Sequence, residues 1–328
     1  MKLERNPQMT IMNYDLDKIV KDSHPLKRIE KTVSLRKISL GFKELKKNTG
    51  RNGYGVEVGI KCLFLQFYYD LSDRELEDRL RYDLAFRWFC GFVVDDETPD
   101  HTYFCRIRKV LGTARIGKIF RKINSKAQDK GIMRNVFTFV DSSAVKTKET
   151  TWSQRDKAIK AGEEALNNKN VSKYSADKDA RFGCKGKSKF WYGYKRHTSV
   201  DMCSGLIKKT AMTPANVSDQ NGLEHICPAE GMVFADKGYC LKEAQKILRK
   251  NGCHSGAIKK RNMNGKNKDK DRWISSLRSP YERVFSNQLK RARYRGLAKV
   301  QMQAFLEAIV FNVKRLIRLD APPLCLGA

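Results

Sequence analysis

Two aspartates each stand directly after a short, largely apolar run, and this arrangement could support chemistry. Asp141 follows the run at 136–140, and Asp236 follows the run at 232–235. An apolar run without alternation predicts a strand that is buried on both faces, as in a parallel sheet between helices. If the two strands are neighbours, both carboxylates lie at one edge of the sheet, where like charges repel each other. A divalent metal ion would remove this repulsion, so we predict that both aspartates are metal ligands.

Glu282 is the third candidate ligand. It follows Pro280, a residue suited to the first turn of a helix. Phosphoryl transfer on nucleic acid uses carboxylates of this kind to hold two metal ions roughly 3.5–4 Å apart. Because the ligands offer only oxygen, they favour Mg²⁺ or Mn²⁺ over zinc. We therefore predict that Asp141, Asp236 and Glu282 are the catalytic residues and hold two ions in each active site.

The elements that must position these carboxylates alternate between strands and helices. Strands are expected at 136–140, 190–200, 206–212, 232–235 and 255–258. Helices are expected at 219–226, with Asp219 as the N-cap, and at 241–250. This order predicts an α/β protein with an RNase H-like catalytic domain, a mixed five-stranded sheet with flanking helices. The polar stretch at 146–189 has few apolar residues, which favours a flexible insertion.

Ahead of the sheet, residues 56–131 contain a series of predicted helices. Ser72 and Glu75 form a capping box that opens one of them. A later helix carries the basic residues Arg106, Arg108 and Lys109. Such helices predict an all-α, helix-turn-helix-like DNA-binding domain, although periodicity alone favours a bundle with solvated arginines equally. The expected domains are an arm at 1–55, the helical domain at 56–133, the catalytic domain at 134–320 and a tail at 321–328.

The charge of the chain indicates a polyanionic partner. The 328 residues include 66 Lys and Arg against 36 Asp and Glu, a formal net charge of +30. A phosphate backbone is the obvious polyanion, so double-stranded DNA is the expected partner. Lys195 and Lys237 stand near the predicted site and could contact phosphate, while a solvated surface role suits each of them equally.

Cysteine usage and hydropathy indicate the compartment. The nine cysteines include no C-x-x-C pair, which argues against a zinc ribbon, and free thiols suit a reducing cytoplasm. No apolar stretch has transmembrane length, and no signal peptide is recognisable at the N-terminus. We therefore expect a cytoplasmic protein without a membrane partner.

Short strings along the chain match a known family in the same order, from about Tyr54 to Leu316. They are Leu-Ser-Asp-Arg-Glu-Leu-Glu (71–77), Phe-Arg-Trp-Phe-Cys-Gly (86–91), Pro-Asp-His-Thr (99–102), Arg-Ile-Arg (106–108), Asp-Ser (141–142), Asp-Lys-Asp-Ala (177–180), Tyr-Gly-Tyr-Lys (192–195), Thr-Pro-Ala-Asn (213–216), Ala-Asp-Lys-Gly-Tyr (235–239), Arg-Ser-Pro-Tyr-Glu-Arg-Val-Phe (278–285) and Arg-Tyr-Arg-Gly-Leu (293–297). Each string is weak by itself, but their joint occurrence in this order is specific. The chain resembles the DDE transposases of bacterial insertion sequences, in the group numbered family five and related to family four.

The resemblance implies a transposase that binds the terminal inverted repeats of an insertion sequence and catalyses DNA strand cleavage and strand transfer. It implies Asp141, Asp236 and Glu282 as the metal-binding triad of an RNase H-like domain. It also implies target DNA as a further partner, a homodimer on the DNA, and a protein associated with the bacterial nucleoid.

The related families share a tyrosine, arginine, glutamate and lysine signature around Glu282. Arg278 fits this signature, and on a helix it would lie about 40° from the face of Glu282, where it could orient that residue or grip a phosphate. Ser275 occupies the tyrosine position, and Leu289 occupies the lysine position. Lys290 comes one residue after the lysine position, which turns its side chain by about 100° on a helix. The sequence therefore does not decide whether Lys290 contacts phosphate, or whether the protein uses the hairpin chemistry tied to this signature.

Two other functions agree with parts of the sequence. The first is a non-catalytic, transposase-derived DNA-binding protein, which would have no need of the three carboxylates Asp141, Asp236 and Glu282. The second is an RNase H-like nuclease, which would have less need of a full helical N-terminal domain. We therefore expect an active transposase.

Overall fold

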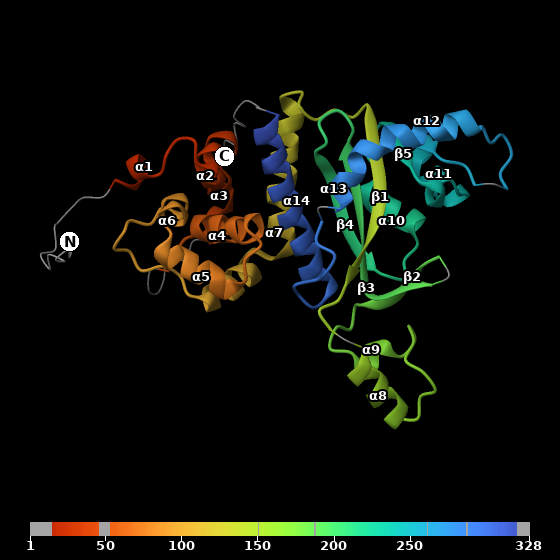
Figure 1. The fold of residues 1–328 in the computed structure, drawn as a ribbon, viewed down its shortest axis with the longest axis horizontal. Coiled ribbons are helices and arrows are strands. Elements are labelled where there is room, and N and C mark those ends of the chain that lie inside the picture. The colour runs from red at the N-terminus through yellow and green to blue at the C-terminus, as the bar shows by residue number, and fades with distance from the viewer. Residues whose placement is uncertain are drawn as a thin grey trace, which may run out of the picture. The chain divides into compact units, whose positions relative to one another are not determined.

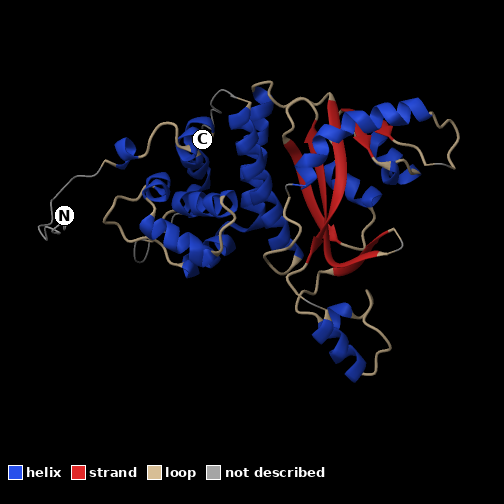
Figure 2. Cartoon of the chain, in the orientation of Figure 1, coloured by secondary structure: helices blue, strands red, loops and turns tan. Residues whose placement is uncertain are grey.

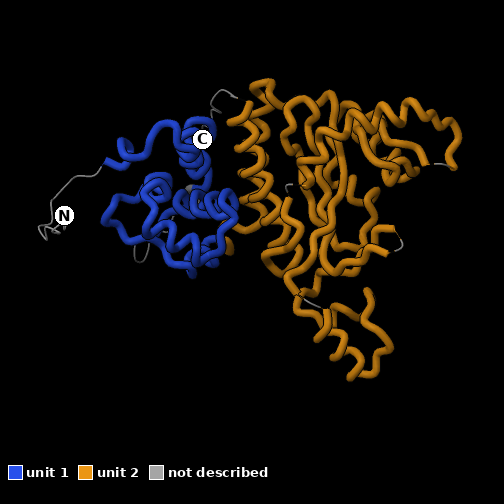
Figure 3. The backbone as a smooth tube through the Cα atoms, in the orientation of Figure 1, with its two compact units in different colours: residues 1–107 blue, residues 108–328 orange. Residues whose placement is uncertain are grey.

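A computed structural model describes most of the chain as two compact units. The described residues are 15–45, 53–149, 151–186, 188–260, 262–286 and 288–319. The units comprise residues 1–107 and 108–328 (Figure 3). The predicted tail at 321–328 lies outside the described residues. Within the described ranges, no helix has the length and apolar character needed to span a bilayer.

The first unit consists of helices. They are α1 (Leu16–Ile19), α2 (Pro25–Thr32), α3 (Leu35–Ser39), η1 (Leu40–Leu45), α4 (Val56–Tyr68), α5 (Asp73–Tyr82), α6 (Leu84–Cys90) and the start of α7 (His101–Asp129) (Figure 1). The capping box of α5 is confirmed, because Ser72 Oγ accepts from the Glu75 N–H and the Glu75 carboxylate accepts from the Ser72 N–H. Apolar side chains of α4 and α6 form the core, where the Phe64 and Phe89 rings lie 5.9 Å apart. The predicted helical character of this region is confirmed.

Helix α7 crosses the division between the two units. Gly112 interrupts it with φ +61° and ψ 177°, a conformation that glycine adopts without strain. Beyond the glycine, Phe120 packs its ring on Phe305, and Asn124 donates to the carbonyl of Ile207. The domain boundary was predicted at 133, whereas the compact units divide after Ile107, because the second half of α7 packs against the elements that follow it in the chain.

The second unit is built on one mixed sheet of six strands (Figure 2). The strands are β1 (Phe137–Lys146), β2 (Arg181–Lys185), β3 (Lys189–Asp201), β4 (Ile207–Pro214), β5 (Gly231–Ala235) and β6 (Cys253–Ala257). The helices are α8 (Trp152–Lys160), α9 (Val171–Tyr174), α10 (Asp219–Ile226), η2 (Lys237–Tyr239), α11 (Lys242–Lys250), α12 (Lys268–Arg278), η3 (Ser279–Tyr281), α13 (Glu282–Ser286) and α14 (Leu297–Arg318). The strand order is β2-β3-β1-β5-β6, and β4 also pairs with β3. This mixed sheet with flanking helices confirms the RNase H-like α/β fold.

Two features of this unit differ from the sequence prediction. The sheet has a sixth strand, β2, and the stretch at 146–189 contains α8 and α9 rather than one flexible insertion. Few apolar residues suffice for this order, because Val171 is fully buried and the Phe182 ring packs 5.0 Å from the Tyr192 ring. The stabilising contacts come from strand β3, which lies later in the chain, so composition within 146–189 could not reveal them.

Strand β5 is buried on both faces, as its apolar run predicted. Val233 and Ala235 pack into a cluster with residues of α10 and α11. Phe234 faces the opposite side and packs with Ile274 of α12. Since side chains alternate along a strand, the residue after Ala235 points toward the α12 side.

Candidate active site

Asp141 and Asp236 lie at matching positions of neighbouring strands. Asp141 was predicted to follow its strand, but β1 continues to Lys146 through its pairing with β3, so Asp141 lies in the middle of β1, whereas Asp236 directly follows β5. Strands β1 and β5 are parallel neighbours, with Phe137 paired to Met232 and Phe139 paired to Phe234. Continuing this register by two residues brings Asp141 level with Asp236. The strand pairing therefore places the two carboxylates side by side, as the two apolar runs predicted.

Both carboxylates also belong to the same face of the sheet. Phe139 packs its ring 5.2 Å from that of Phe285 in α13, on the side where Phe234 meets α12. With a side-chain period of two, Asp141 follows Phe139 and Asp236 follows Phe234 onto this face. Helices α12 and α13 therefore cover the face that carries the two aspartates.

Arg278 supplies the counter-charge at this position. Its Nη1 lies 3.6 Å from Asp236 Oδ1, and its guanidinium carbon lies 5.0 Å from the centre of the Phe139 ring. The Arg278 side chain is only 10% exposed, whereas that of Asp236 is 54% exposed. Burial raises the pKa of Asp141 to about 6, while the Ser142 N–H and the charge of Arg278 oppose this rise. Arg278 thus sits between a buried carboxyl and a solvated carboxylate.

Glu282 does not join the two aspartates in this arrangement. It is the first residue of α13 and is exposed. The short helix η3 separates it from Arg278, and Tyr281 anchors that turn by donating to the carbonyl of Met202. Across the described ranges, no three His, Cys, Asp or Glu side chains gather closely enough to hold one metal ion. The two aspartates fit a divalent cation, and the third predicted ligand stands apart from them.

A further carboxylate, Asp219, lies beside Asp141. Its Oδ1 accepts from Ser142 Oγ at 2.7 Å and forms an ion pair with Lys195 Nζ at 2.9 Å. Although burial raises the pKa of Asp219, the charge and hydrogen bond of Lys195 hold it below its usual value. Asp219 was predicted as the N-cap of its helix, but Ser218 caps α10, and Asp219 in its first turn is free to face the sheet.

The two predicted phosphate-binding lysines differ in their surroundings. Lys195 is 12% exposed, and its Nζ donates to the carbonyl of Val217 as well as pairing with Asp219. Lys237 follows Asp236 directly and is exposed. Only Lys237 of this pair therefore presents its ammonium group to a ligand.

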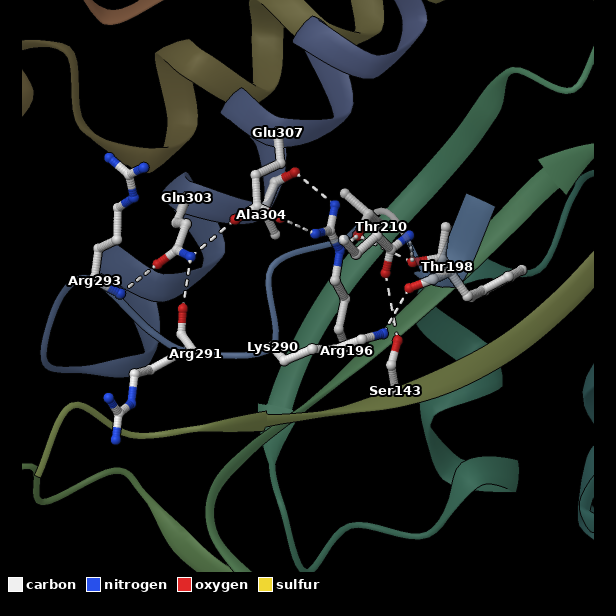
Figure 4. A network of polar contacts seen from close by, with 12 residues as sticks. Ser143, Arg196, Thr198, Thr210, Lys290, Arg291, Arg293, Gln303, Ala304 and Glu307 are labelled. Atoms are coloured by element: carbon white, nitrogen blue, oxygen red, sulfur yellow. Dashed lines mark hydrogen bonds and ion pairs between the residues drawn. The ribbon is translucent and has the colours of Figure 1, made fainter. Parts of the chain in front are cut away.

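Lys290 lies within a polar network beside strand β1, where its carbonyl accepts from the Lys146 N–H (Figure 4). Its Nζ donates to the carbonyl of Phe285 at 2.6 Å. Burial and the charge of Arg196 lower the pKa of Lys290, and the charge of Asp141 opposes this. Arg196 itself is fully buried, where it pairs with Glu307 of α14 and donates to the carbonyl of Ala304. The network fixes the segment that follows α13 against β3 and α14.

The three basic residues predicted to contact DNA all lie on α7. Arg106 and Lys109 are exposed, and Arg106 donates to Thr102 Oγ1 at 2.9 Å. Arg108 is half-buried, with its guanidinium carbon 5.3 Å from the centre of the Tyr294 ring. Two of the three residues therefore present charge directly to solvent.

The sequence analysis did not predict that Asp219 lies beside Asp141. The string Thr-Pro-Ala-Asn at 213–216 directs attention to this region, but the chain separation between Asp219 and Asp141 hides their contact. Only the pairing of β1 with β3, and the packing of α10 on those strands, brings the two carboxyl groups together.

Comparisons with known proteins follow the same division of the chain. Residues 14–110 match the family described as Transposase domain (DUF772), and residues 133–313 match the family described as Transposase DDE domain. One relative is the transposase for insertion sequence element IS1106 of Neisseria meningitidis serogroup B. It is 30% identical over 239 residues, which cover 67% of this chain and 80% of that protein.

Two solved structures show a slight likeness to the chain. A Mos1 transposase paired-end complex with the left transposon end aligns with a TM-score of 0.19 and 6% identity, over 85% of this chain and 83% of that chain. A pre-cleavage Mos1 transpososome aligns with a TM-score of 0.17 and 7% identity, over 83% of this chain and 99% of that chain. Scores this low carry no argument about this protein.

Proposed function

Since the chain belongs to the DDE transposases of insertion sequences, enzymes that cleave DNA and transfer its strands, we propose that it acts on the ends of such an element. It binds the terminal inverted repeats, hydrolyses a phosphodiester to expose a 3′-OH, and joins that hydroxyl to target DNA. The observation that carries this proposal is the pair of carboxylates, Asp141 within β1 and Asp236 directly after β5, at matching positions of two adjacent parallel strands. The formal charge of +30 supports DNA as the substrate.

We assign the metal ligands to Asp141, Asp236 and Glu282, with two Mg²⁺ or Mn²⁺ ions in the site. Two adjacent carboxylates offer the oxygen ligands that these cations prefer. When bound, the ions would activate the attacking oxygen and stabilise charge on the leaving oxygen. Since Glu282 stands apart from the aspartates in the structure, this assignment requires it to enter the site when the substrate binds.

The surrounding residues prepare the two aspartates for this role. Arg278 balances the charge of Asp236. When a metal cation binds Asp236 instead, the guanidinium of Arg278 can bind a phosphate of the DNA. Lys195 and Ser142 hold Asp219 next to Asp141, so we assign Lys195 to positioning rather than to phosphate contact. Lys237 contacts phosphate, and Lys290 adds positive charge near Asp141. Arg106, Arg108 and Lys109 contribute to DNA binding from α7.

The test is cleavage of a duplex that carries the DNA flanking this reading frame. With Mg²⁺ or Mn²⁺, the wild-type protein should nick the duplex at the element's end, and Ca²⁺ should permit binding with little cleavage. Asp236→Asn should lose cleavage by at least roughly a hundredfold and retain DNA binding, because one metal ligand is replaced by a neutral amide. Asp156→Asn, at an exposed position of α8, is the matched control and should cleave as the wild type does. Undiminished cleavage by Asp236→Asn would refute the assignment of the triad.

A further inference from the structure

An open pocket of about 390 Å³ lies directly beside Asp236. Its walls come from three places in the chain: the turn after β5, the loop that follows β6, and one side of α12. Ligand pockets in proteins commonly have volumes of about 300–1,000 Å³, so this one can hold a group of the size of a single nucleotide.

The lining of the pocket is strongly basic. Its cationic residues are Lys237, Lys266, Lys268, Arg272 and Arg278. The acidic residues Asp236 and Asp271 oppose them, which leaves a net formal charge of +3 on the described lining. A cation would be repelled by this surface, so the pocket suits an anion.

Most of this positive charge is not neutralised by ion pairs within the protein. Lys237 and Lys268 form no ion pair with any residue that the structure describes. Arg272 pairs only loosely with Asp269, at 3.8 Å between side chains that are 84% and 90% exposed, a contact worth little in water. Lys266 lies 3.8 Å from Asp271. The cations therefore remain available to a ligand.

Arg278, in the buried wall of the pocket, also favours an anionic ligand. Its side chain is nine-tenths buried, yet its Nε has no hydrogen-bond acceptor within the described part of the chain. A buried donor without a partner costs free energy, so the protein alone does not fully satisfy this guanidinium at the wall of the pocket. Arg278 thus links the pocket to the carboxylate at which the chemistry is proposed.

We infer that this pocket binds a nucleotide of the DNA strand next to the reacting phosphodiester, with Lys268 and Arg272 of α12 holding its phosphate. The inference rests on the proposed function, since it places the pocket along the path of the substrate strand. Two strands offer the same chemistry: the strand at the element's end and a strand of the target DNA.

The test compares two doubly substituted full-length proteins of equal charge. Lys268→Gln with Arg272→Gln removes two cations from the pocket, and Lys246→Gln with Arg249→Gln removes the same two types of side chain from the exposed face of α11. Affinity is measured in chelator, without cleavage, for a duplex carrying the element's end and for a scrambled duplex of equal length. The conservative pair Lys268→Arg and Arg272→Lys tests whether charge alone suffices.

We expect the pocket variant to bind DNA about tenfold more weakly, to lower the slope of log affinity against log salt by one to two, and to be rescued by the conservative pair. The α11 variant should stay within twofold of the wild type. If the pocket variant loses affinity only for the duplex with the element's end, the pocket binds the strand at that end. If it loses affinity equally for both duplexes, the pocket binds a DNA strand whatever its sequence, whether from the element or from the target. If the pocket variant binds both duplexes as the α11 variant does, the inference is wrong.

The outcome is separable from that of the proposed function. Normal DNA binding by the pocket variant, together with lost cleavage by Asp236→Asn, rejects the pocket and leaves the transposase proposal standing. Weak binding by the pocket variant, together with normal cleavage by Asp236→Asn, supports the pocket as a DNA site and rejects the triad.

Discussion

At the scale of single residues, the site holds a carboxyl group that is costly to ionise. Asp141 is kept from water by the helices over its face of the sheet, and burial raises its pKa to about 6. Arg278 offsets only part of this cost, because the same guanidinium also pairs with Asp236. The ionised carboxylate is therefore unfavourable at Asp141, the position where we propose that a cation binds.

The first prediction concerns Asp141 and pH. Its pKa is higher in the folded protein than the ordinary 3.8, so folding favours the protonated form. The resulting destabilisation is absent below about pH 4, develops as pH rises toward 6, and is complete above it, where it amounts to up to about 3 kcal/mol. Asp141→Asn should therefore unfold at a higher temperature than the wild type at pH 8 in chelator.

Thermal unfolding at a series of pH values measures this effect. The melting temperature of Asp141→Asn should exceed that of the wild type by less and less as pH falls from 6 to 4. The difference between Asp156→Asn and the wild type should show no such trend. If the wild type and Asp141→Asn melt at the same temperature at pH 8 as well as at pH 4, Asp141 ionises without cost in the folded protein.

At the scale of elements, the register between β1 and β3 decides where the strand that carries Asp141 lies. Strand β1 pairs with β3 from Thr138 opposite Asp201 to Lys146 opposite Gly193. Gly193 stands at the end of this ladder with φ +153°, and a Cβ there would lie 2.2 Å from the carbonyl oxygen of Val145. The close approach of the two backbones thus depends on the absence of a side chain.

The second prediction is that Gly193→Ala destabilises the protein. The clash is with backbone, which cannot move aside as a flexible side chain can, so the loss should be about 2 kcal/mol or more. Chemical denaturation measures it, with Gly55→Ala as the control, because a Cβ at Gly55 meets no atom within 4 Å. A Gly193→Ala protein as stable as the control would show that β1 and β3 can separate there without cost.

At the scale of the whole molecule, the net charge governs association. A chain with a formal charge of +30 repels its own copies until a polyanion neutralises it. Transposition must hold two DNA ends at once, and each active site acts on one end. Two protomers on paired ends are the simplest assembly that meets both conditions.

The third prediction is therefore a monomer or weak dimer alone and a dimer on paired end DNA. Light scattering of the full chain, with and without duplexes carrying the element's end, gives the mass of each species. A scrambled duplex is the control and should not organise a defined dimer. A complex with one protomer for each pair of ends that still transposes would contradict this prediction.

The sequence by itself determined the features that depend on neighbours along the chain. The apolar runs before Asp141 and Asp236 predicted two buried strands, because a strand covered on both faces is built mainly from apolar residues. The capping box at Ser72 and Glu75 predicted the start of α5, because its hydrogen bonds span three residues. The net charge also indicated a polyanionic partner from the sequence alone, because a sum of charges does not depend on the fold.

Only the tertiary structure decided the features that depend on contacts between distant segments. The register of β1 against β3 and the packing of α10 bring Asp219 and Lys195 to Asp141. The turn η3 separates Glu282 from Arg278, although on one helix the two residues would lie near the same face. The basic pocket joins residues of three elements, and β2 is stabilised by a strand that follows it. Such contacts depend on packing in three dimensions, which local sequence patterns do not encode.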